Sequence, residues 1–542
     1  MTLTLLIAAL MSQVPAPAAE AAAKPAEAAA EAPAPAKPIF TPSETRSRGS
    51  VTIGGKKIAY QAVAGTLVIH GKDWDDTKPL EEAASPPKKD KGKDDDGDEP
   101  APEASMFYAA YFKDGALAAG RPITFLFNGG PGSSTVWLHM GAFGPVRVQT
   151  ADTRHTPAAP YLVVNNDQSL LDASDLVFVD APGTGFSRIG GKDKDKAFYG
   201  VDQDIDAFTQ FITQFLSKYG RWNSPKYIFG ESYGTMRAAG LALALQNKDV
   251  DLNGVILLSD ILAWDLLPDD PQVNPGNDFP YVMTLPTYAA TAWYHNRIAR
   301  PDGDLQSFLA RVENFATTDY LQALIKGNEL GDEERQRIAR QLSAYTGLTV
   351  PYLLKTDLRI QYGAFQKELL ADREETVGTL DTRFIGATLD PIAKVASNDP
   401  QSSAISSAYV AAYNDYVRAS LRYEPGIEFK SGISIYDSWD YKHKPPGGDR
   451  ALIALPNVLP DLAVAMKQNP DLKVMVNGGY YDVSTPYFAG RFEMRHLPIP
   501  DRLKSNIEYR YYESGHMVYA HLPSLKAIHD NVAQFIGRTE GR

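Results

Sequence analysis

The sequence predicts an α/β fold in which a mostly parallel central sheet carries helices on both faces and a helical segment is inserted into the chain. Short apolar segments with strand character alternate with segments whose apolar residues recur every three or four positions, which is typical of parallel βαβ units. The alternation stops in residues 263–455, where proline-rich loops and helical runs predominate, and then resumes. We therefore expect one core in two parts, 39–262 and 456–542, with the insertion between them.

The expected strands of the core are compact apolar runs. Antiparallel strands are expected first, at Val51–Ile53, Lys57–Tyr60, Thr66–Ile69 and Met106–Phe112. Parallel strands are expected next, at Ile123–Phe127, Leu176–Val179, Tyr227–Phe229, Val255–Leu258, Leu472–Val476 and Ile507–Tyr511.

The helices that should cover this sheet are recognised by their apolar spacing. In 202–219, apolar side chains recur at helical spacing from Ile205 to Tyr219, and Gly220 stands where a glycine C-cap ends a helix. His529 lies opposite the apolar positions of the last helix and is expected to face solvent. The other expected core helices are 235–247, 459–468 and 523–537, and those of the insertion are 287–300, 332–346 and 403–421.

The composition excludes several classes of protein. The chain has 542 residues, of which 44% are hydrophobic and 22% charged, so global disorder and a fibrous repeat are excluded. Beyond the N-terminus no apolar run approaches the ~20 residues that a membrane span needs. The net charge of −12 gives no sign of the basic face of a nucleic-acid binder. The absence of cysteine excludes disulfides, thiolate metal sites and cysteine nucleophiles.

The N-terminal residues indicate export. Residues 1–11 are apolar and Ala16–Ala19 offers a cleavage site of small residues, so 1–19 is expected to be a signal peptide that directs the protein to the periplasm or the cell exterior. No Lys or Arg precedes the apolar run, which leaves a disordered Ala-rich tail as the alternative. An Ala/Pro-rich linker is expected at 20–38 and a disordered charged loop at 81–104.

A Gly-x-Ser-x-Gly motif, Gly230–Gly234 (Gly-Glu-Ser-Tyr-Gly), lies between the expected strand 227–229 and helix 235–247. This is the context of a nucleophile elbow, in which the glycines permit a strained turn that lifts the serine above the sheet. Ser232 is therefore the predicted nucleophile, and a loop serine without a catalytic role is the alternative.

A serine hydroxyl at its ordinary pKa is a weak nucleophile, so it needs a base, and the base needs an acid to orient it. In this architecture the acid and then the histidine follow later strands. His516 lies just past the expected strand 507–511 with a glycine before it, whereas His295 and His443 lie in or beside the insertion. His516 is therefore the predicted base, with a structural loop histidine as the alternative.

The acid should follow a strand between the serine and the histidine. Asp482 follows the strand that precedes the histidine's strand, and Asp260, after Val255–Leu258, is the competing candidate. We prefer Asp482 because of that adjacency, although either aspartate could instead cap a turn.

An oxyanion needs preorganised N–H donors. One donor should be the backbone N–H of Tyr233, the residue after the nucleophile, and the other should come from an early loop at a strand end. The loop Asn128–Ser134 (Asn-Gly-Gly-Pro-Gly-Ser-Ser) directly follows strand 123–127. We expect it to be the oxyanion loop rather than a tight turn without a catalytic role.

Taken together, these segments resemble the serine carboxypeptidases, a family of the α/β-hydrolase superfamily. The resemblance is carried, in the family's order, by Asn128–Ser134, Gly141–Val146 (Gly-Ala-Phe-Gly-Pro-Val), Val179–Ser187 (Val-Asp-Ala-Pro-Gly-Thr-Gly-Phe-Ser), Gly230–Gly234, Asp482–Pro486 and Gly515–Val518. It implies an α/β-hydrolase fold with a helical lid, and an enzyme that removes the last residue of peptides with a free C-terminus.

The resemblance also implies a role for each matching residue. The catalytic triad corresponds to Ser232, Asp482 and His516. The oxyanion hole corresponds to the backbone N–H groups of Gly130 and Tyr233. Recognition of the substrate's C-terminal carboxylate corresponds to Asn128, Gly129 and Glu231. A protonated Glu231 would donate to such a carboxylate, whereas an ionised one would repel it.

The sequence departs from the family's pattern at several positions. Phe127 stands where the family usually has Trp, and Ser133 stands where it has Cys. Ala142 stands where the family has a second glutamate, which shares a proton with the first. Without that like charge, Glu231 lacks a group that keeps it protonated near neutral pH. An esterase or acyltransferase on the same fold and triad is therefore the alternative function.

A serine-type carboxypeptidase that acts on peptides is the leading prediction. A non-catalytic binding module on a retained hydrolase fold is a third hypothesis, against which the intact Ser232, Asp482 and His516 argue. The sequence indicates no cofactor and no metal site, since no His-Glu-x-x-His motif occurs.

Overall fold

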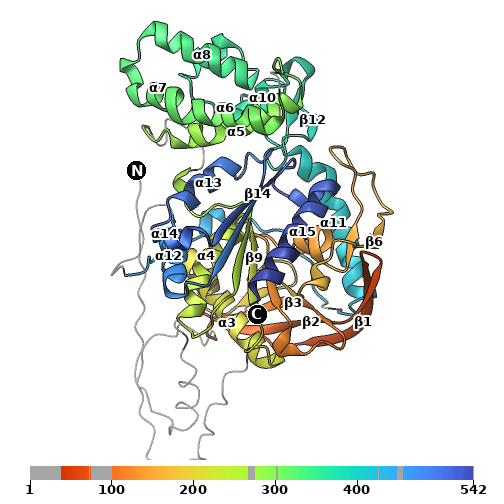
Figure 1. Cartoon of the computed structure of the whole chain (residues 1–542). Helices are drawn as coiled ribbons and strands as arrows, with labels where there is room; N and C mark the ends of the chain where they lie inside the picture. The colour runs from red at the N-terminus through yellow and green to blue at the C-terminus, as the bar shows by residue number, and fades with distance from the viewer. Residues whose placement is uncertain are drawn as a thin grey trace, which may run out of the picture. The chain divides into compact units, whose positions relative to one another are not determined.

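The computed structural model describes residues 38–72, 74, 100–266, 275–300, 303–424, 426–447 and 456–540 (Figure 1). The predicted signal peptide 1–19 lies outside the described residues, as do the expected linker up to residue 37 and residues 75–99, which hold most of the expected charged loop. No described helix combines the length and the apolar character that a membrane span requires.

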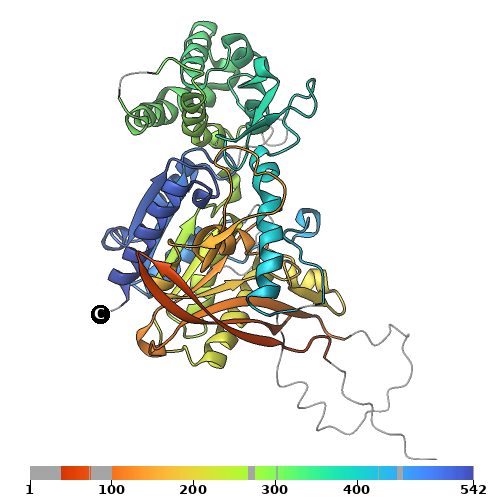
Figure 2. The same ribbon diagram turned by 90° about the vertical axis from the view of Figure 1, so that its right-hand side faces the viewer.

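Within the described residues, the core is a sheet of ten strands in the order β1-β2-β3-β7-β4-β9-β10-β13-β14, with β8 beside β3. The pairs from β1 to β7 are antiparallel, and those from β7 to β14 are parallel. This confirms the predicted α/β class with a mostly parallel central sheet, and Figure 2 shows its long twisted strands β1 and β2. The strands are β1 (Glu44–Ile53), β2 (Lys56–His70), β3 (Glu103–Lys113), β4 (Ile123–Phe127), β7 (Asp175–Val179), β8 (Arg188–Gly190), β9 (Lys226–Glu231), β10 (Gly254–Leu258), β13 (Lys473–Gly479) and β14 (Ile507–Tyr512).

The register of the parallel strands brings their carboxyl ends to one edge of the sheet. Phe127 at the end of β4 pairs with Gly230 of β9, and Leu258 at the end of β10 pairs with Glu231. β13 continues this alignment, because its Asn477 pairs with Leu258. The loops after these strands therefore leave the sheet side by side, which is where the ligand sites of open parallel sheets lie.

Helices cover both faces of the sheet, because alternate side chains of each strand point to opposite faces. On β4, Phe125 and Phe127 belong to one buried cluster and Leu126 to the other. The helices of the first cluster are α3 (Val201–Tyr219), α4 (Tyr233–Gln246) and α12 (Leu459–Gln468), and those of the second are α11 (Pro400–Ala419) and α15 (Leu522–Thr539) (Figure 1).

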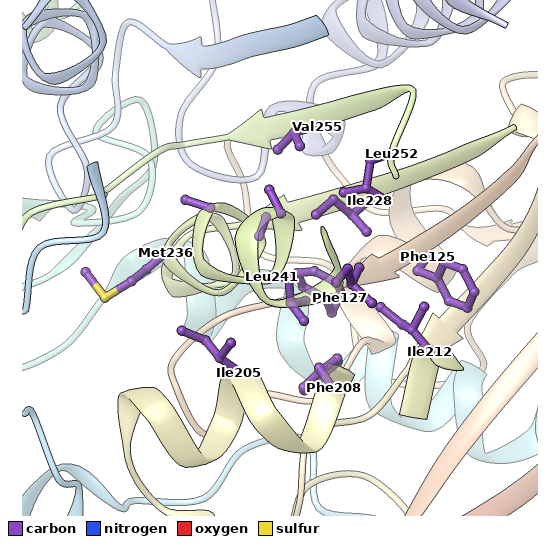
Figure 3. Close-up of a cluster of buried hydrophobic side chains, with 14 of the residues drawn as sticks. Phe125, Phe127, Ile205, Phe208, Ile212, Ile228, Met236, Leu241, Leu252 and Val255 are labelled. Atoms are coloured by element: carbon purple, nitrogen blue, oxygen red, sulfur yellow. The ribbon is translucent and has the colours of Figure 1, made fainter. Parts of the chain in front are cut away.

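Helix α3 shows how the predicted apolar spacing is used. Figure 3 shows Ile205, Phe208 and Ile212 of this helix turned toward the side chains of β4 and α4. The rings of Phe127 and Phe208 lie 5.1 Å apart, edge to face. Gly220 ends the helix with φ 62°, and its N–H donates to the carbonyls of the last turn, as predicted.

The insertion is helical over most of its described residues, as predicted. One of its helices, α11, packs against the core sheet in the second cluster, although 403–421 was expected to be a helix of the lid. The others are α5 (Phe279–Tyr294), α6 (Leu305–Phe315), α7 (Leu321–Lys326), α8 (Asp332–Thr346), α9 (Val350–Lys355) and α10 (Tyr362–Glu368), and the small antiparallel pair β11 (Glu375–Val377) and β12 (Ile385–Ala387) lies between α10 and α11 in the chain. These helices share a buried cluster of their own, which also takes in Tyr480, Tyr481 and Tyr487 of the core. The shorter elements of the core are α2 (Lys194–Phe198), α13 (Tyr487–Arg495), α14 (Asp501–Lys504), β5 (Val146–Val148) and β6 (Val163–Asn165).

Two features of the helices differ from the sequence predictions. The helix expected at 287–300 is α5, which begins at Phe279 and runs through Pro286, because its apolar side chains pack along the whole length into the lid cluster. His529 does not face solvent: it is 7% exposed, because Asp172 covers that side of α15 with Oδ2 3.2 Å from Nε2 of the histidine.

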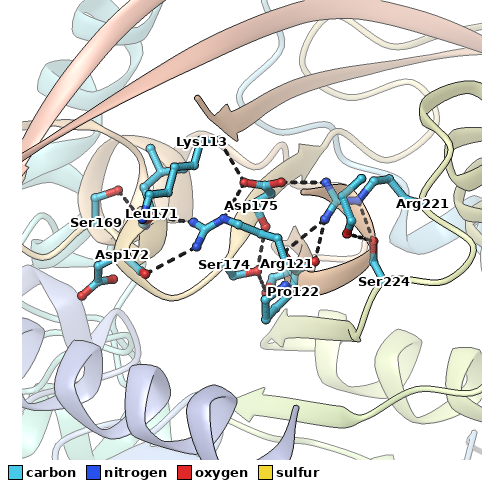
Figure 4. A network of polar contacts seen from close by, with 12 residues as sticks. Lys113, Arg121, Pro122, Ser169, Leu171, Asp172, Ser174, Asp175, Arg221 and Ser224 are labelled. Atoms are coloured by element: carbon cyan, nitrogen blue, oxygen red, sulfur yellow. Dashed lines mark hydrogen bonds and ion pairs between the residues drawn. The ribbon is translucent and has the colours of Figure 1, made fainter. Parts of the chain in front are cut away.

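A network of buried charged side chains surrounds Asp175, the first residue of β7 (Figure 4). Asp175 accepts from Nε of Arg121 at 2.9 Å and from Nη1 of Arg221 at 2.6 Å. The backbone N–H of Lys113 on β3 donates to the same carboxylate at 3.0 Å. Asp175 and Arg221 are 3% and 2% exposed, so water cannot replace either partner. The carboxylate thus joins β3, β7 and the residues before β4 and β9.

We predict that Asp175→Asn lowers the free energy of unfolding by about 3–5 kcal/mol, because two buried guanidinium groups lose their counter-charge. The measurement is denaturant unfolding followed by circular dichroism. The matched control is Asp319→Asn, which breaks an ion pair with Arg337 in which both side chains are about half exposed. Its midpoint should stay within error of the wild type, and an equal shift in both variants would contradict the prediction.

Candidate active site

Ser232 occupies the turn between β9 and α4, and the turn has the geometry of a nucleophile elbow. Its backbone is at φ 60° and ψ −132°, a strained conformation for a residue with a side chain. Two glycines make the turn sterically possible. A Cβ on Gly230 would meet the carbonyl oxygen of Gly234, and a Cβ on Gly234 would lie 2.9 Å from the carbonyl oxygen of Phe127. Ser232 is partly exposed, whereas Glu231 and Tyr233 on either side of it are buried.

The structure places Asp482 against His516. Oδ2 of Asp482 lies 2.8 Å from Nδ1 of His516, and the two side chains are 0% and 6% exposed. Burial lowers the pKa of His516, but the carboxylate of Asp482 outweighs that effect and raises the pKa above its usual value. A carboxylate at Nδ1 leaves Nε2 as the nitrogen that can act as a base.

Thr485 orients this carboxylate and was not singled out from the sequence. Its backbone N–H donates to Oδ1 of Asp482 at 3.0 Å and its hydroxyl donates to Oδ2 at 2.7 Å. The sequence does contain a signal for this contact, because an aspartate followed three residues later by a threonine is typical of turns that are capped by side chains.

Asp260, the competing candidate for the acid, does not contact His516. It is 3% exposed, and within the described residues its Oδ2 has no hydrogen-bond partner. Burial raises its pKa to about 7. The neighbouring Ser259 donates instead to the backbone carbonyl of His516 at 2.8 Å.

The predicted oxyanion loop lies directly on the elbow. A Cβ on Gly129 would collide with the backbone nitrogen of Tyr233, so only glycine allows this approach. Gly130 has φ 110°, a conformation that glycine adopts readily. Tyr233 is the first residue of α4, where a backbone N–H has no partner within the helix and is available to a substrate.

Arg237 of α4 links the predicted oxyanion loop to helix α3. Its guanidinium is fully buried, pairs with Asp204 of α3 at 2.7 Å and donates from Nη1 to the carbonyl of Asn128 at 2.8 Å. A buried charge with satisfied hydrogen bonds holds its partners in one arrangement. The loop is therefore fixed to both α3 and α4.

A segment of the insertion, residues 428–443, also forms hydrogen bonds with the predicted oxyanion loop. Ile433 N–H donates to the carbonyl of Gly132 at 2.8 Å, and the hydroxyl of Tyr436 donates to the carbonyl of Gly130 at 2.7 Å. The ring of Trp439 packs edge to face on Tyr233 at 5.4 Å. The 428–443 segment thus contacts both residues whose N–H groups are the predicted oxyanion donors.

His443 anchors the end of the 428–443 segment. Its Nδ1 lies 2.7 Å from Oδ1 of Asp202 and its Nε2 lies 2.8 Å from Oδ2 of Asp461. Burial lowers the pKa of His443, but the two aspartates outweigh it and raise the pKa to about 9. The histidine is therefore a cation held between two carboxylates at neutral pH.

A second segment of the insertion, residues 379–383, forms hydrogen bonds with the loops that carry Asp482 and His516. The backbone N–H of His516 donates to the carbonyl of Leu380 at 2.6 Å, and Gly515 N–H donates to Oδ2 of Asp381 at 3.2 Å. Arg383 forms a buried ion pair with Asp381 at 2.6 Å. These partners were not singled out from the sequence, because nothing local to residues 379–383 indicates which loop they touch.

The remaining predicted residues gather beside the elbow. Glu231 is 2% exposed and Asn128 is 3% exposed. Burial raises the pKa of Glu231 to about 7, although the charge of His516 and hydrogen bonds from Tyr519 and Asn128 act in the opposite direction. Below that pH the group is a neutral carboxyl that can donate a hydrogen bond. Among the described residues, no group of three or more His, Asp or Glu side chains is arranged to hold a metal ion.

Comparison with known proteins relates the first part of the core to one family. Residues 98–262, which include the oxyanion loop and the elbow, match the sequence model of the serine carboxypeptidase family. The pheromone-processing carboxypeptidase KEX1 of Yarrowia lipolytica is 34% identical over 141 residues, 25% of this chain and 21% of that protein. The retinoid-inducible serine carboxypeptidase of Homo sapiens is 31% identical over 183 residues, 30% of this chain and 36% of that protein.

These matches span 21–36% of the length of the two relatives. The crystal structure of Kex1(Δ)p, a prohormone-processing carboxypeptidase from Saccharomyces cerevisiae, superposes with a TM-score of 0.49 at 16% identity, over 88% of this chain and 91% of that one.

We predict that Asp482→Asn lowers kcat roughly 10⁴-fold, because the histidine loses the group that fixes its tautomer and stabilises its charge. Asp260→Asn is the matched control, a second buried carboxyl near the same loops, and should change kcat less than tenfold. The measurement is hydrolysis of a p-nitrophenyl ester by variants whose melting midpoints are unchanged. A larger loss in Asp260→Asn would assign the orienting acid to Asp260.

We predict that His443 stabilises the fold at low and neutral pH and ceases to do so in alkali. Its pKa in the folded protein, about 9, lies above the ordinary value of 6.5, so its contribution is complete below pH 6.5 and is lost as pH rises through 9. The measurement is the difference in melting midpoint between the wild type and His443→Gln from pH 5.5 to 10. A difference that does not shrink toward pH 10 would contradict this assignment.

Proposed function

We propose that this chain, whose residues 98–262 match the sequence model of the serine carboxypeptidase family, is a serine-type carboxypeptidase that releases C-terminal amino acids from peptides. The observation that carries the proposal is a buried, protonatable carboxyl, Glu231, directly before the predicted nucleophile at the edge of the sheet where Asp482 meets His516. A hydrolase that acts on neutral esters has no need of such a group at this place.

In the proposed reaction Ser232 Oγ attacks the carbonyl carbon of the last peptide bond while Nε2 of His516 takes the hydroxyl proton. The C–N bond then breaks, and the histidine returns the proton to the leaving amine. Water, activated by the same histidine, cleaves the acyl-enzyme ester and restores the serine hydroxyl. Asp482 keeps the imidazole oriented and stabilises its transient positive charge.

The backbone N–H groups of Gly130 and Tyr233 are the proposed oxyanion donors. The close approach of Gly129 to Tyr233 brings the loop and the start of α4 together, which supports this assignment. Both are backbone donors on rigid elements, so stabilisation of the oxyanion requires no reorganisation during the reaction.

Asn128, Gly129 and Glu231 are the proposed recognition group for the substrate's free carboxylate. Burial keeps Glu231 protonated up to a pH of about 7, so it donates to a carboxylate below that pH and repels it above. Export to the periplasm or the cell exterior is a further part of the proposal that rests on residues 1–19 alone.

Ala142 is the observation that favours a second candidate, an esterase or acyltransferase. It supplies no carboxyl beside Glu231, so carboxylate recognition depends on one acid instead of two. The same triad and oxyanion donors would serve either activity.

We predict that the protein releases the terminal residue from blocked dipeptides with a free C-terminus and that Ser232→Ala abolishes this release. The KM for these peptides should rise as pH increases through about 7, where Glu231 ionises, and the KM for the corresponding amides should not. The measurement is product release from acids, amides and a p-nitrophenyl ester between pH 4 and 8.

Each outcome of this experiment assigns a function. Serine-dependent release that favours the free acids supports the carboxypeptidase. Equal turnover of acids and amides, or ester cleavage without peptide release, would leave the triad intact and replace the exopeptidase with the esterase or acyltransferase. Inertness of the folded protein to a fluorophosphonate probe would overturn catalysis by Ser232.

A further inference from the structure

A tyrosine that no sequence motif singled out contacts the carboxyl of Glu231. Tyr519 lies in the 3-10 turn Val518–Ala520, three residues after His516, and its hydroxyl is 2.8 Å from Oε2 and 3.1 Å from Oε1 of Glu231. Its side chain is 3% exposed and that of Glu231 is 2% exposed. Since neither group can exchange its partner for water, the two are strongly coupled.

The ring of Tyr519 fills the space beside the turn that carries Ala142. This turn, Leu138–Phe143, is buried, and a Cβ on Gly141 would lie 2.8 Å from Cδ2 of Tyr519. Tyr409 of α11 packs on the same turn, with its hydroxyl 2.5 Å from that Cβ position, so the side chains around this turn are phenols and not a second acid. Burial raises the pKa of Tyr519 well above its usual value, so the phenol keeps its proton.

We propose that Tyr519 is a specificity residue of this site: its hydroxyl holds the carboxyl of Glu231 in the free enzyme and donates to the C-terminal carboxylate of a bound peptide. This inference rests on the proposed function and names the group that completes recognition where Ala142 supplies none. A phenol has one proton, so the incoming carboxylate takes the hydrogen bond that Glu231 accepts beforehand.

The donors around the bound carboxylate are then sufficient for its two oxygens. Protonated Glu231 supplies one O–H and Tyr519 supplies another. Oδ1 of Asn128 accepts from the backbone N–H of Leu138 at 3.2 Å, and its amide NH₂ group donates toward Glu231 and Tyr519 in the free enzyme. In the proposed complex one of these N–H groups turns to the bound carboxylate as a third donor. Each of these donors would form a charge-assisted hydrogen bond with the bound carboxylate.

The charge of Glu231 depends on all the titratable groups that face it. These are His516 and Asp482 from the base and acid loops, Tyr519, and Tyr409 of α11. Tyr519 donates to the carboxyl and so favours its ionised form. Removal of that hydroxyl must therefore raise the pKa of Glu231 and keep the group protonated to a higher pH.

The first test is Tyr519→Phe. We expect the preference for a free-acid dipeptide over its amide, measured as the ratio of kcat/KM at pH 5.5, to fall roughly 10- to 100-fold, the value of a hydrogen bond to a charged group. The loss should appear in KM and leave kcat nearly unchanged. We also expect the alkaline decline of this ratio to move to higher pH. The ratio cancels the titration of His516, because both substrates need the same base.

The matched control is Tyr413→Phe. Tyr413 is another buried tyrosine of the same hydrophobic cluster, but its ring packs on His139, with centroids 5.2 Å apart. Loss of its hydroxyl should leave the acid-to-amide ratio and the pH profile unchanged. Melting midpoints of both variants report whether the fold is intact.

Replacement of Tyr519 by 3-fluorotyrosine keeps the ring and its packing if the phenylalanine variant does not fold. The fluorinated phenol is a stronger donor, so it lowers the pKa of Glu231 and must move the alkaline decline of the ratio to lower pH. Movement in opposite directions for the two substitutions supports the proposal.

The outcomes separate this inference from the function on which it rests. A wild-type enzyme without any preference for free acids overturns both. A wild-type preference that survives Tyr519→Phe with an unmoved pH profile overturns the role of Tyr519 and leaves the carboxypeptidase intact. An equal loss of kcat/KM for the acid and the amide would show that Tyr519 acts on the triad, and would also overturn its role in carboxylate recognition.

Discussion

The turn at Ser232 sets the geometry to which the rest of the site conforms. With φ at 60°, β9 can pass into α4 only where the backbone before and after the serine comes into close contact, and glycines at 230 and 234 allow that contact. The close approach also draws the oxyanion loop onto the turn, where Gly129 lies against the nitrogen of Tyr233. One strained residue thus aligns the predicted nucleophile and a predicted oxyanion donor, and the parallel register of the strands brings the remaining loops to the same edge.

Buried ion pairs hold the two ends of the central strands. At the amino end Asp175 joins the segments before β4 and β9, and at the carboxyl end Arg237 and Asp204 join α3, α4 and the carbonyl of Asn128. Such pairs contribute little net stability relative to apolar side chains, but breaking one leaves an uncompensated charge. Their effect here is to permit one arrangement of the loop and helices.

The sheet, its helices and the elbow were predictable because each depends on local sequence. Apolar periodicity identifies the elements, and Gly-x-Ser-x-Gly between a strand and a helix identifies the turn. What the sequence could not predict depends on packing between distant segments. A proline usually ends a helix, so the sequence predicts that no helix passes through Pro286, yet α5 does. The side of the last helix that carries His529 was expected to face solvent, but Asp172, far away in the chain, covers it. The contact between Glu231 and Tyr519 joins residues 288 positions apart, and no spacing rule relates them.

Two segments of the insertion form hydrogen bonds with the loops of the candidate site. Residues 379–383 accept from the backbone of His516, and the 428–443 segment donates to the carbonyls of the oxyanion loop. Loss of these hydrogen bonds would release His516 and the predicted oxyanion loop from the geometry that the proposed mechanism needs. The buried cluster of α5 to α10 also takes in Tyr480, Tyr481 and Tyr487 of the core, so the insertion packs on the residues beside Asp482 as well as on the loops of His516 and Gly130.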